Sequence, residues 1–485
     1  MLSVNKRAAS FLILAAMLTS SVSCASSVGQ ADSSEEVTQT GEAPTGSVTA
    51  EPAQEAATEP MTQPVEEKTS QAGVKGNIYD VKGRLLVSNG TDSSGRPMRV
   101  YADDYAVSFA NVVTEMSDGY DTAFNDILSE QQPGTDVGQS IELTIDADVQ
   151  NAVYDYMQST NLVGSVVALR TDGSVLAQVS YPSYDPRTVT DQKYDEELAW
   201  GKCGNKAFQN FEPGSCFKIM SEVIADKHGF YSCHDEGEWK FDGISIVNWD
   251  HDTGSYPVER TLQSAFINSS NIFFAKAFDS IGTDAVLSDL DSIFHFQTPI
   301  DCDFGEIKNN VEIYCEDDLR RTAFGQSYVL TCPLYLAALG REAAFGDMVK
   351  PFVLKDIVDT NDSTKVLKEG SARSEVIATI PQEYRQNLQD GMRGVAGGLG
   401  VYVPQGYSLY AKTGTAETWE NDFLYITGCV KNDSDDGSAV YDDYSNYNGS
   451  YVIVMQVRNP ADHGFEFASH SASLYQGVIN AIVGK

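Results

Sequence analysis

Basic residues are scarce in this chain of 485 residues. It has 33 lysines and arginines against 69 aspartates and glutamates, so its formal net charge is −36. A nucleic acid would be repelled by such a chain rather than bound through counterion release, and we therefore exclude nucleic-acid partners. The acidity alone indicates no particular substrate.

Cysteines and histidines are also few, at eight and six. Residues 233–236 (CHDE) and 249–252 (WDHD) contain metal-binding residue types, but their spacing matches no closed zinc pattern. We therefore expect neither a metal nor another cofactor. A chain of this length can bury a large core, so its stability need not depend on disulfides.

Only one apolar run stands near the N-terminus, and it is short for a membrane span. This run, Ala8–Met17, follows Lys6 and Arg7, a pattern typical of an export signal. The following SSVSC ends at Cys24 and resembles the lipobox of bacterial lipoproteins. We therefore predict a lipoprotein-type signal peptide over 1–24 and a lipidated Cys24 at the outer face of the cell membrane. Cleavage near Ala25 and an uncleaved anchor remain alternatives.

The next segment, 25–73, is composed mainly of Ser, Thr, Glu, Gln, Ala and Pro without apolar periodicity. Such a segment cannot bury enough apolar surface to offset its ordering entropy, so we predict a disordered tether. Ordered structure is expected from Val74. We divide it into a small N-terminal domain over 74–148 and a main domain over 149–485.

Strand patterns occur at both ends of the main domain. Two apolar strands flank Asp172-Gly173, and three more are predicted at 407–417, 422–430 and 450–457. Helices are expected at 147–160 and 471–484, next to these strands, with more helical sequence between. The pattern predicts an α/β fold of the α+β type, in which helices cover one antiparallel five-stranded sheet.

Two further segments complete the expectations about local structure. The segment 119–134 is predicted as a helix that ends before Pro133. The segment 431–450 is acidic and rich in tyrosine, and it is long for a hairpin loop. We interpret it as a solvated insertion, with partner binding as the alternative.

Ser215 and Lys218 lie three residues apart in FEPGSCFKIM. One interpretation makes Ser215 a helix N-cap and Lys218 an ordinary surface lysine. The other uses the same geometry, because residues i and i+3 share a helix face and an amine can then lie beside the hydroxyl. A serine becomes a nucleophile when a neighbour removes its proton, and a lysine of lowered pKa can do this.

Two other motifs favour the second interpretation. INSSNIFF contains Ser269 and Asn271 at a predicted helix start, and YAKTGTAE places Lys412 at the end of a predicted strand. Ser-x-x-Lys, Ser-x-Asn and Lys-Thr-Gly, in this order, are the signature of serine β-lactamases and penicillin-binding proteins.

Several segments then resemble the monofunctional, class B-like penicillin-binding transpeptidases. They are GSVVALRTDGSVLAQVSYPSYDP, NKAFQNFEPGSCFKIM, LQSAFINSSNIFFAKAF and TAFGQSYVLTCPLYLAALGREAAFGD, and the N-terminal KGNIYDVKGRLLVSN resembles the start of the family's non-catalytic domain. The resemblance runs from about residue 74 to the end. Cys216 stands where threonine is usual, Lys75 where arginine is usual, and Ala411 where glycine is frequent.

The resemblance implies catalytic roles for four positions. Ser215 would be the acylated nucleophile and Lys218 its general base. Ser269 would relay a proton to the leaving amine, and Lys412 would supply positive potential.

It also implies roles in substrate binding. Asn271 would bind the peptide amide of the substrate, and Gly414 would permit close backbone approach. Thr413 and Thr415 would hold the terminal carboxylate. The backbone N–H groups of Ser215 and Thr415 would form the oxyanion hole, whose single donors are worth roughly 3–4 kcal/mol.

The function implied is a peptidoglycan D,D-transpeptidase that acts on D-Ala-D-Ala stem peptides and binds β-lactams covalently. A glycan polymerase of the wall machinery is an implied partner. The alternatives are a D,D-carboxypeptidase or β-lactamase with the same nucleophile, and a non-catalytic β-lactam sensor or scaffold. A role in division, elongation or sporulation is left open.

Overall fold

The computed structural model describes residues 74–115, 119–189, 201, 204–370, 373–417, 422–439, 441, 444, 447–465 and 468–484. All of them belong to one compact unit, Ala72–Lys485. The predicted signal peptide and tether lie outside the described residues. Across these ranges, no helix is both long and apolar enough to cross a membrane.

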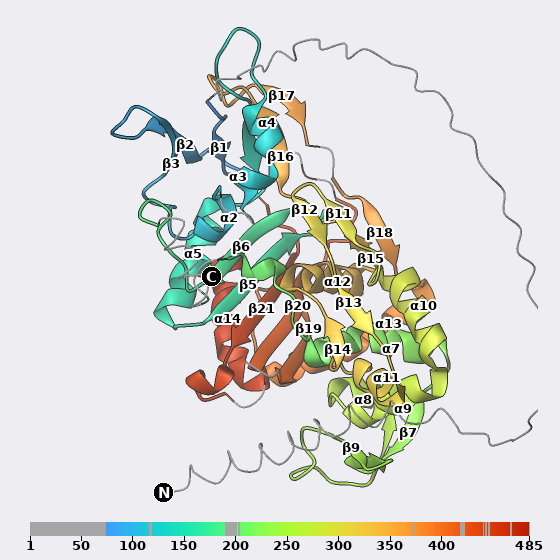
Figure 1. The fold of residues 1–485 in the computed structure, drawn as a ribbon. Helices are drawn as coiled ribbons and strands as arrows, with labels where there is room; N and C mark the ends of the chain where they lie inside the picture. The colour runs from blue at the N-terminus through green and yellow to red at the C-terminus, as the bar shows by residue number, and fades with distance from the viewer. Residues whose placement is uncertain are drawn as a thin grey trace, which may run out of the picture. The chain divides into compact units, whose positions relative to one another are not determined.

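The predicted five-stranded sheet is confirmed. Its strands run in the order β19 (Tyr407–Glu417), β20 (Asp422–Asn432), β21 (Tyr451–Arg458), β5 (Gly164–Arg170) and β6 (Val175–Tyr181), and every neighbouring pair is antiparallel. Three strands from the C-terminal end therefore pair with two from the start of the main domain, and β19 is an edge strand (Figure 1).

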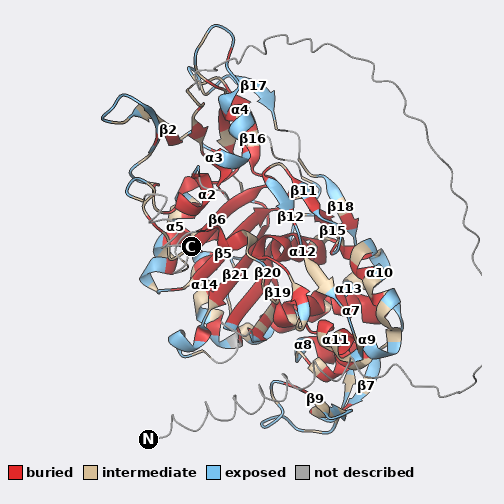
Figure 2. Cartoon of the chain, viewed as in Figure 1, coloured by how far each residue is buried: buried red, intermediate tan, exposed pale blue. Residues whose placement is uncertain are grey.

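The sheet separates two hydrophobic cores. On one face, α5 (Ala147–Ser159) and α14 (Ala472–Val483) pack against alternate side chains such as Val166 of β5. On the other face, α12 (Pro333–Phe345) packs against the intervening side chains such as Val167. Side chains of successive strand residues point to opposite faces, so one sheet can serve both cores, and Figure 2 shows its strands buried over most of their length.

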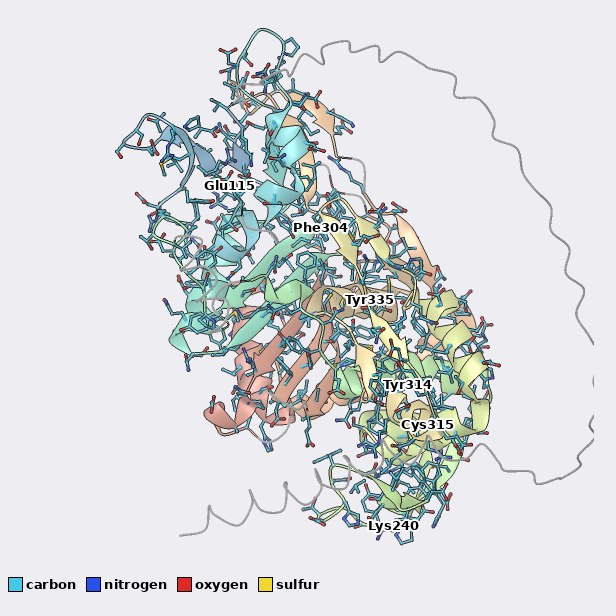
Figure 3. All side chains as sticks on the ribbon, viewed as in Figure 1. Glu115, Lys240, Phe304, Tyr314, Cys315 and Tyr335 are labelled. Carbon is cyan, nitrogen blue, oxygen red and sulfur yellow. The ribbon has the colours of Figure 1, made fainter. Side chains whose placement is uncertain are left out.

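Helices gather beyond the α12 face, next to β19 (Figure 1). They are α7 (Lys218–Lys227), α8 (Leu262–Ile267), α9 (Asn271–Ile281), α10 (Thr283–Phe294), α11 (Glu316–Thr322) and α13 (Gln382–Leu399). Tyr335 of α12 is fully buried among them and donates its hydroxyl proton to Phe294 O at 2.8 Å. Tyr314, also labelled in Figure 3, lies on the surface and is 70% exposed.

A second sheet contains the strands of the N-terminal region. Its order is β17 (Val366–Glu369), β16 (Leu354–Val358), β4 (Ser140–Leu143), β1 (Ile78–Tyr79), β2 (Leu85–Thr91) and β3 (Pro97–Tyr101). The two strands β16 and β17 come from the middle of the chain, so the region 74–148 is joined to the main domain by continuous backbone pairing.

The remaining elements are short. They are α2 (Ala110–Val113), α3 (Tyr120–Ala123), α4 (Asn125–Ser129), β7 (Ser232–Asp235), β8 (Glu238–Phe241), β9 (Ile244–Val247), β10 (Val258–Thr261), β11 (Ile300–Cys302), β12 (Gly305–Ile307), β13 (Asn310–Glu312), β14 (Tyr328–Leu330), β15 (Asp347–Val349) and β18 (Val376–Thr379), with 3-10 turns η2 (Lys206–Phe208), η3 (Gly214–Phe217), η4 (Pro460–His463) and η5 (Ala468–Ser471). The single helix predicted within 119–134 is wrong, because the chain forms α3 and α4, which meet at Phe124.

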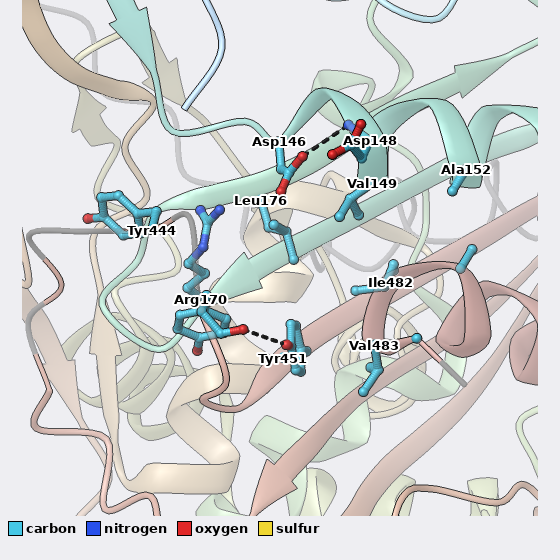
Figure 4. Close-up of a pocket in the computed structure, with 13 residues that line it drawn as sticks. Asp146, Asp148, Val149, Ala152, Arg170, Leu176, Tyr444, Tyr451, Ile482 and Val483 are labelled. Atoms are coloured by element: carbon cyan, nitrogen blue, oxygen red, sulfur yellow. Dashed lines mark hydrogen bonds between the residues drawn. The ribbon is translucent and has the colours of Figure 1, made fainter. Parts of the chain in front are cut away.

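The prediction of a solvated insertion at 431–450 agrees with the exposed acidic residues Asp433 and Asp436 but is wrong for Tyr444. Tyr444 is 2% exposed, donates to Asp172 Oδ2 at 2.7 Å, and its ring lies 4.7 Å from the guanidinium carbon of Arg170. Arg170, Tyr444 and Tyr451 line a cavity of about 390 Å3 on the α5 and α14 side of the sheet (Figure 4). A buried arginine thus attracts the aromatic segment to the sheet.

Candidate active site

Ser215 lies in the 3-10 turn η3, directly before α7. The first interpretation, in which Ser215 is the N-cap of this helix, is wrong, because the N-cap residue of α7 is Phe217 and no side chain caps it. Gly214 adopts φ +52°, and a Cβ atom there would overlap Thr415 O. Only glycine fits this position, which lets the turn pack directly against β19.

Gly325 holds the same turn from the other side. Its carbonyl oxygen accepts the Gly214 N–H at 3.0 Å, and its own φ is +75°. A Cβ atom at Gly325 would overlap Gly214 O. The nucleophile turn is therefore fixed between two backbone segments, β19 and the turn that follows α11.

Lys218 is fully buried, and its Nζ lies 2.9 Å from Ser215 Oγ. The same nitrogen lies 2.8 Å from Ser269 O, 3.2 Å from Ser269 Oγ and 2.7 Å from Asn271 Oδ1. The i, i+3 geometry expected from the sequence is confirmed, although the turn between the two residues is a 3-10 turn.

The second motif surrounds the start of α9. Ser270 is the N-cap, and its Oγ accepts the Phe273 N–H at 3.1 Å. Ser269 precedes it at φ +56°, a conformation that non-glycine residues seldom adopt. This conformation directs both Ser269 O and Ser269 Oγ toward Lys218 Nζ.

The third motif lies on β19, against the nucleophile turn. Lys412 is fully buried, and its Nζ donates to Ser269 Oγ at 3.1 Å and to Thr413 O at 2.9 Å. A Cβ atom at Gly414 would lie 2.6 Å from Pro213 O, so glycine permits this close approach. Thr415 Oγ1 accepts the Ala468 N–H at 3.4 Å.

Burial controls the electrostatics of the two lysines. Burial, and then the positive charge of Lys412, hold the pKa of Lys218 well below its usual value. Burial lowers the pKa of Lys412 to about 8. Burial also raises the pKa of Cys216, so this residue stays a neutral thiol next to both amines.

These groups form a site in which a hydroxyl faces an amine whose pKa is lowered by burial. Lys218 can accept the proton of Ser215, and Ser269 Oγ lies within hydrogen-bond distance of both lysines. Such a chain of hydroxyl and amine groups can move a proton from an attacking hydroxyl to a departing group.

The structure brings all eight predicted site residues together, on η3, α7, the start of α9 and β19. Cys24 lies outside the described residues. The segments CHDE and WDHD hold no cluster of three or more metal-binding side chains among the residues described. Sequence reasoning missed Gly325, Asp235 and Asn248, which contact the motif residues or their neighbours.

Solved structures share this fold. Penicillin-binding protein A of M. tuberculosis has a TM-score of 0.70 and 22% identity, covering 85% of this chain and 100% of that one. The same protein as its imipenem acyl-enzyme complex gives a TM-score of 0.69 and 21% identity, covering 85% and 99%. The fold class is therefore that of the penicillin-binding proteins.

A comparison with models of protein families identifies the family. The model of the penicillin binding protein transpeptidase domain matches residues 164–466, which is more than half of the chain. The chain belongs to this family.

Curated relatives match the chain over part of their own length. Stage V sporulation protein D of Bacillus subtilis is 24% identical over 355 residues, covering 70% of this chain and 49% of that protein. Peptidoglycan D,D-transpeptidase PbpA of Mycolicibacterium smegmatis is 26% identical over 385 residues, covering 69% and 76%. The chain spans about half the length of the first of these relatives.

Substituting Gly214 tests the close packing of the nucleophile turn. Gly214→Ala should reduce the rate of labelling by a fluorescent penicillin at least tenfold, because its Cβ must displace η3 from Thr415. Gly83→Ala is the matched control, since Gly83 has φ +73° and nothing within 4 Å of the added carbon. Both variants should lose about 1–2 kcal/mol of stability from left-handed strain. Unchanged labelling of Gly214→Ala would contradict the required contact.

Proposed function

We propose that the chain is a peptidoglycan D,D-transpeptidase that forms an acyl-enzyme at Ser215. The observation that carries this proposal is the buried Lys218 amine, 2.9 Å from Ser215 Oγ and also bonded to Ser269 and Asn271. The activity named for PbpA and the β-lactam acyl-enzymes solved for penicillin-binding protein A support it.

Acylation begins with attack of Ser215 Oγ on the carbonyl carbon between two D-alanines. Lys218 takes the hydroxyl proton as the C–O bond forms. Ser269 passes its proton to the leaving nitrogen as the C–N bond breaks and regains a proton from Lys218, so D-alanine departs as a neutral amine and Lys218 is neutral again. An acceptor amine then attacks the ester and loses a proton to Lys218. Lys218 returns that proton to Ser215 Oγ as the ester C–O bond breaks and the cross-linking amide forms.

Binding groups around Ser215 orient the substrate. Thr413 and Thr415 hold the terminal carboxylate, and the charge of Lys412 attracts it. In Asn271, Oδ1 already accepts from Lys218 and Nδ2 already donates to Val247 O. The remaining lone pair of Oδ1 and the remaining hydrogen of Nδ2 therefore bind the peptide amide. The backbone N–H groups of Ser215 and Thr415 bind the oxyanion, an assignment supported by the contact of Gly214 with Thr415.

The location follows from the substrate. Stem peptides lie outside the cytoplasmic membrane, so the proposal requires export, and the SSVSC pattern supports a lipid anchor at Cys24. The segment 25–73 then tethers the domain, and the region 74–148 serves as its small non-catalytic domain. A membrane-bound glycan polymerase is the partner that fits this arrangement.

The fate of the acyl-enzyme separates a transpeptidase from a hydrolase. Benzylpenicillin should add one adduct to Ser215, identified by peptide mass, and Ser215→Ala should remain unlabelled. No segment of the sequence resembles the glutamate-bearing loop with which class A β-lactamases activate water. Deacylation should therefore be slower by about 10²–10⁴, so the adduct should last minutes to hours. Hydrolysis of nitrocefin at several turnovers per second would instead establish a β-lactamase.

The lowered pKa values of Lys218 and Lys412 predict a bell-shaped pH dependence of the acylation rate. The rate should rise with pH as Lys218 loses its proton and fall above about pH 8 as Lys412 loses its charge. Removing that charge should raise the pKa of Lys218, because a positive neighbour disfavours its ammonium form. Lys412→Met should therefore lack the alkaline limb and move the acidic limb to higher pH.

The control for this profile is Lys355→Met, which removes a lysine paired with Glu142 in the N-terminal sheet. It should keep the wild-type profile. An acidic limb that does not move in Lys412→Met would show that the two lysines are not coupled.

The anchor is tested by mass. Cells producing the wild-type protein should yield a mature chain whose N-terminal Cys24 carries lipid. Cys24→Ser should lose the lipid mass and either be released from the membrane or keep its signal. A wild-type N-terminus at Ser26 would indicate ordinary secretion instead.

A further inference from the structure

Two segments with metal-like composition, CHDE and WDHD, meet around a buried polar pair. Asp235 ends β7 and is fully buried, and Asn248 follows β9 and is 3% exposed. Asn248 Nδ2 donates to both carboxylate oxygens of Asp235, each at 2.9 Å. Asp235 also accepts Ser270 Oγ at 2.7 Å and the Gly237 N–H at 2.9 Å. The nearest cation is Arg260, whose Nε lies 3.5 Å from Asp235 Oδ2.

This pair holds the start of α9. The first N–H groups of a helix have no partner within the helix itself. Asn248 Oδ1 accepts two of them, from Asn271 at 2.7 Å and from Ile272 at 3.2 Å. Ser270 Oγ accepts a third, from Phe273, and donates to Asp235. One buried carboxylate therefore fixes both acceptors that cap this helix.

The residues next to Asn248 hold the same segment. Val247 O accepts Asn271 Nδ2 at 2.9 Å, and Trp249 Nε1 donates to Asn268 O at 2.9 Å. These contacts lie on both sides of Ser269, which has the unfavourable φ of +56°. A strained residue persists only where its surroundings determine its conformation, and this segment supplies such surroundings.

The held segment provides partners of the buried Lys218 amine. Ser269 O, Ser269 Oγ and Asn271 Oδ1 all lie within 3.2 Å of Lys218 Nζ. A shift of the start of α9 would move these atoms together, away from the amine that faces Ser215. The effect of such a shift on a reaction is large, since a misplacement of about 1 Å can cost a hundredfold in rate.

We propose that Asp235 and Asn248 are positioning residues for Ser269 and Asn271, and through them for Lys218. The inference rests on the proposed acylation of Ser215. The pair makes no contact with the substrate. It acts by presenting an acceptor to the helix N–H groups, which requires the amide of Asn248 to donate to the carboxylate of Asp235.

The donor and acceptor roles can be exchanged by substitution. Asn248→Asp keeps the acceptor for α9 but places two carboxylates against each other, so the acylation rate at saturating benzylpenicillin should fall between about tenfold and a hundredfold. Adding Asp235→Asn to Asn248→Asp restores one donor and one carboxylate. The double variant should recover to within about threefold of the wild-type rate.

Three measurements distinguish positioning from loss of fold. The rate at saturation should fall more than the affinity for benzylpenicillin, and the final adduct should still reach one per chain. Asp252→Asn is the matched control, because its side chain is 96% exposed in the same region, and it should label at the wild-type rate. If Asn248→Asp does not fold, Asn248→Ser provides the test, since it withdraws the acceptor and should also lose at least tenfold.

The outcomes are separable. If wild-type protein is labelled and the Asn248 variants label equally fast, the positioning role is overturned. It is also overturned if the double variant folds and remains as slow as Asn248→Asp. If the wild-type protein itself is never labelled at Ser215, the proposed function fails, and the pair has no acylation to support.

Discussion

The burial of the Lys218 amine is the constraint on which the rest of the site depends. A buried ammonium is costly, so the group must either lose its proton or find hydrogen-bond acceptors. The structure supplies four acceptor atoms, from Ser215, Ser269 and Asn271, and places a second buried lysine nearby, which favours the neutral form. One acceptor lies on η3 and three lie at the start of α9, so this one nitrogen joins α7 to both segments.

The close approach of backbone segments is the geometric counterpart of that burial. Gly214, Gly325 and Gly414 lack the Cβ atoms that would separate the nucleophile turn from its two neighbours. The site therefore stands on backbone contacts between a sheet edge and a helix start, which are more rigid than loop contacts. On the α5 and α14 side of the sheet, Arg170 and the tyrosine-rich segment complete a separate core. The active site lies apart from this core, next to β19.

The sequence predicted the five-stranded sheet and named eight residues that the structure brings together, because strand alternation and short motifs are local signals. Other features depend on tertiary contacts and gave no such signal. Ser215 did not become a cap, since Gly214 takes a left-handed conformation against Thr415. Tyr444 is buried because it packs against Arg170. This arginine lies more than 270 residues earlier in the chain, so the local sequence around Tyr444 does not indicate the contact. Asp235 was noticed only as part of CHDE and Asn248 not at all, because their pairing arises only when β7 and β9 fold next to α9.

The conformation and the buried charges of the site lower the stability of the folded domain. Left-handed strain at Ser269 costs about 1–2 kcal/mol, and two desolvated lysines add to this cost. Elsewhere, burial raises the pKa of Glu222 and Glu342 well above the usual range, because their charged forms lose hydration inside the helical region. A domain can carry such groups only when its apolar core is large. The two cores on either side of the sheet provide this apolar burial. The strained motif lies at the edge of the cores. There the polar network of Asp235, rather than apolar packing, holds the start of α9 in place.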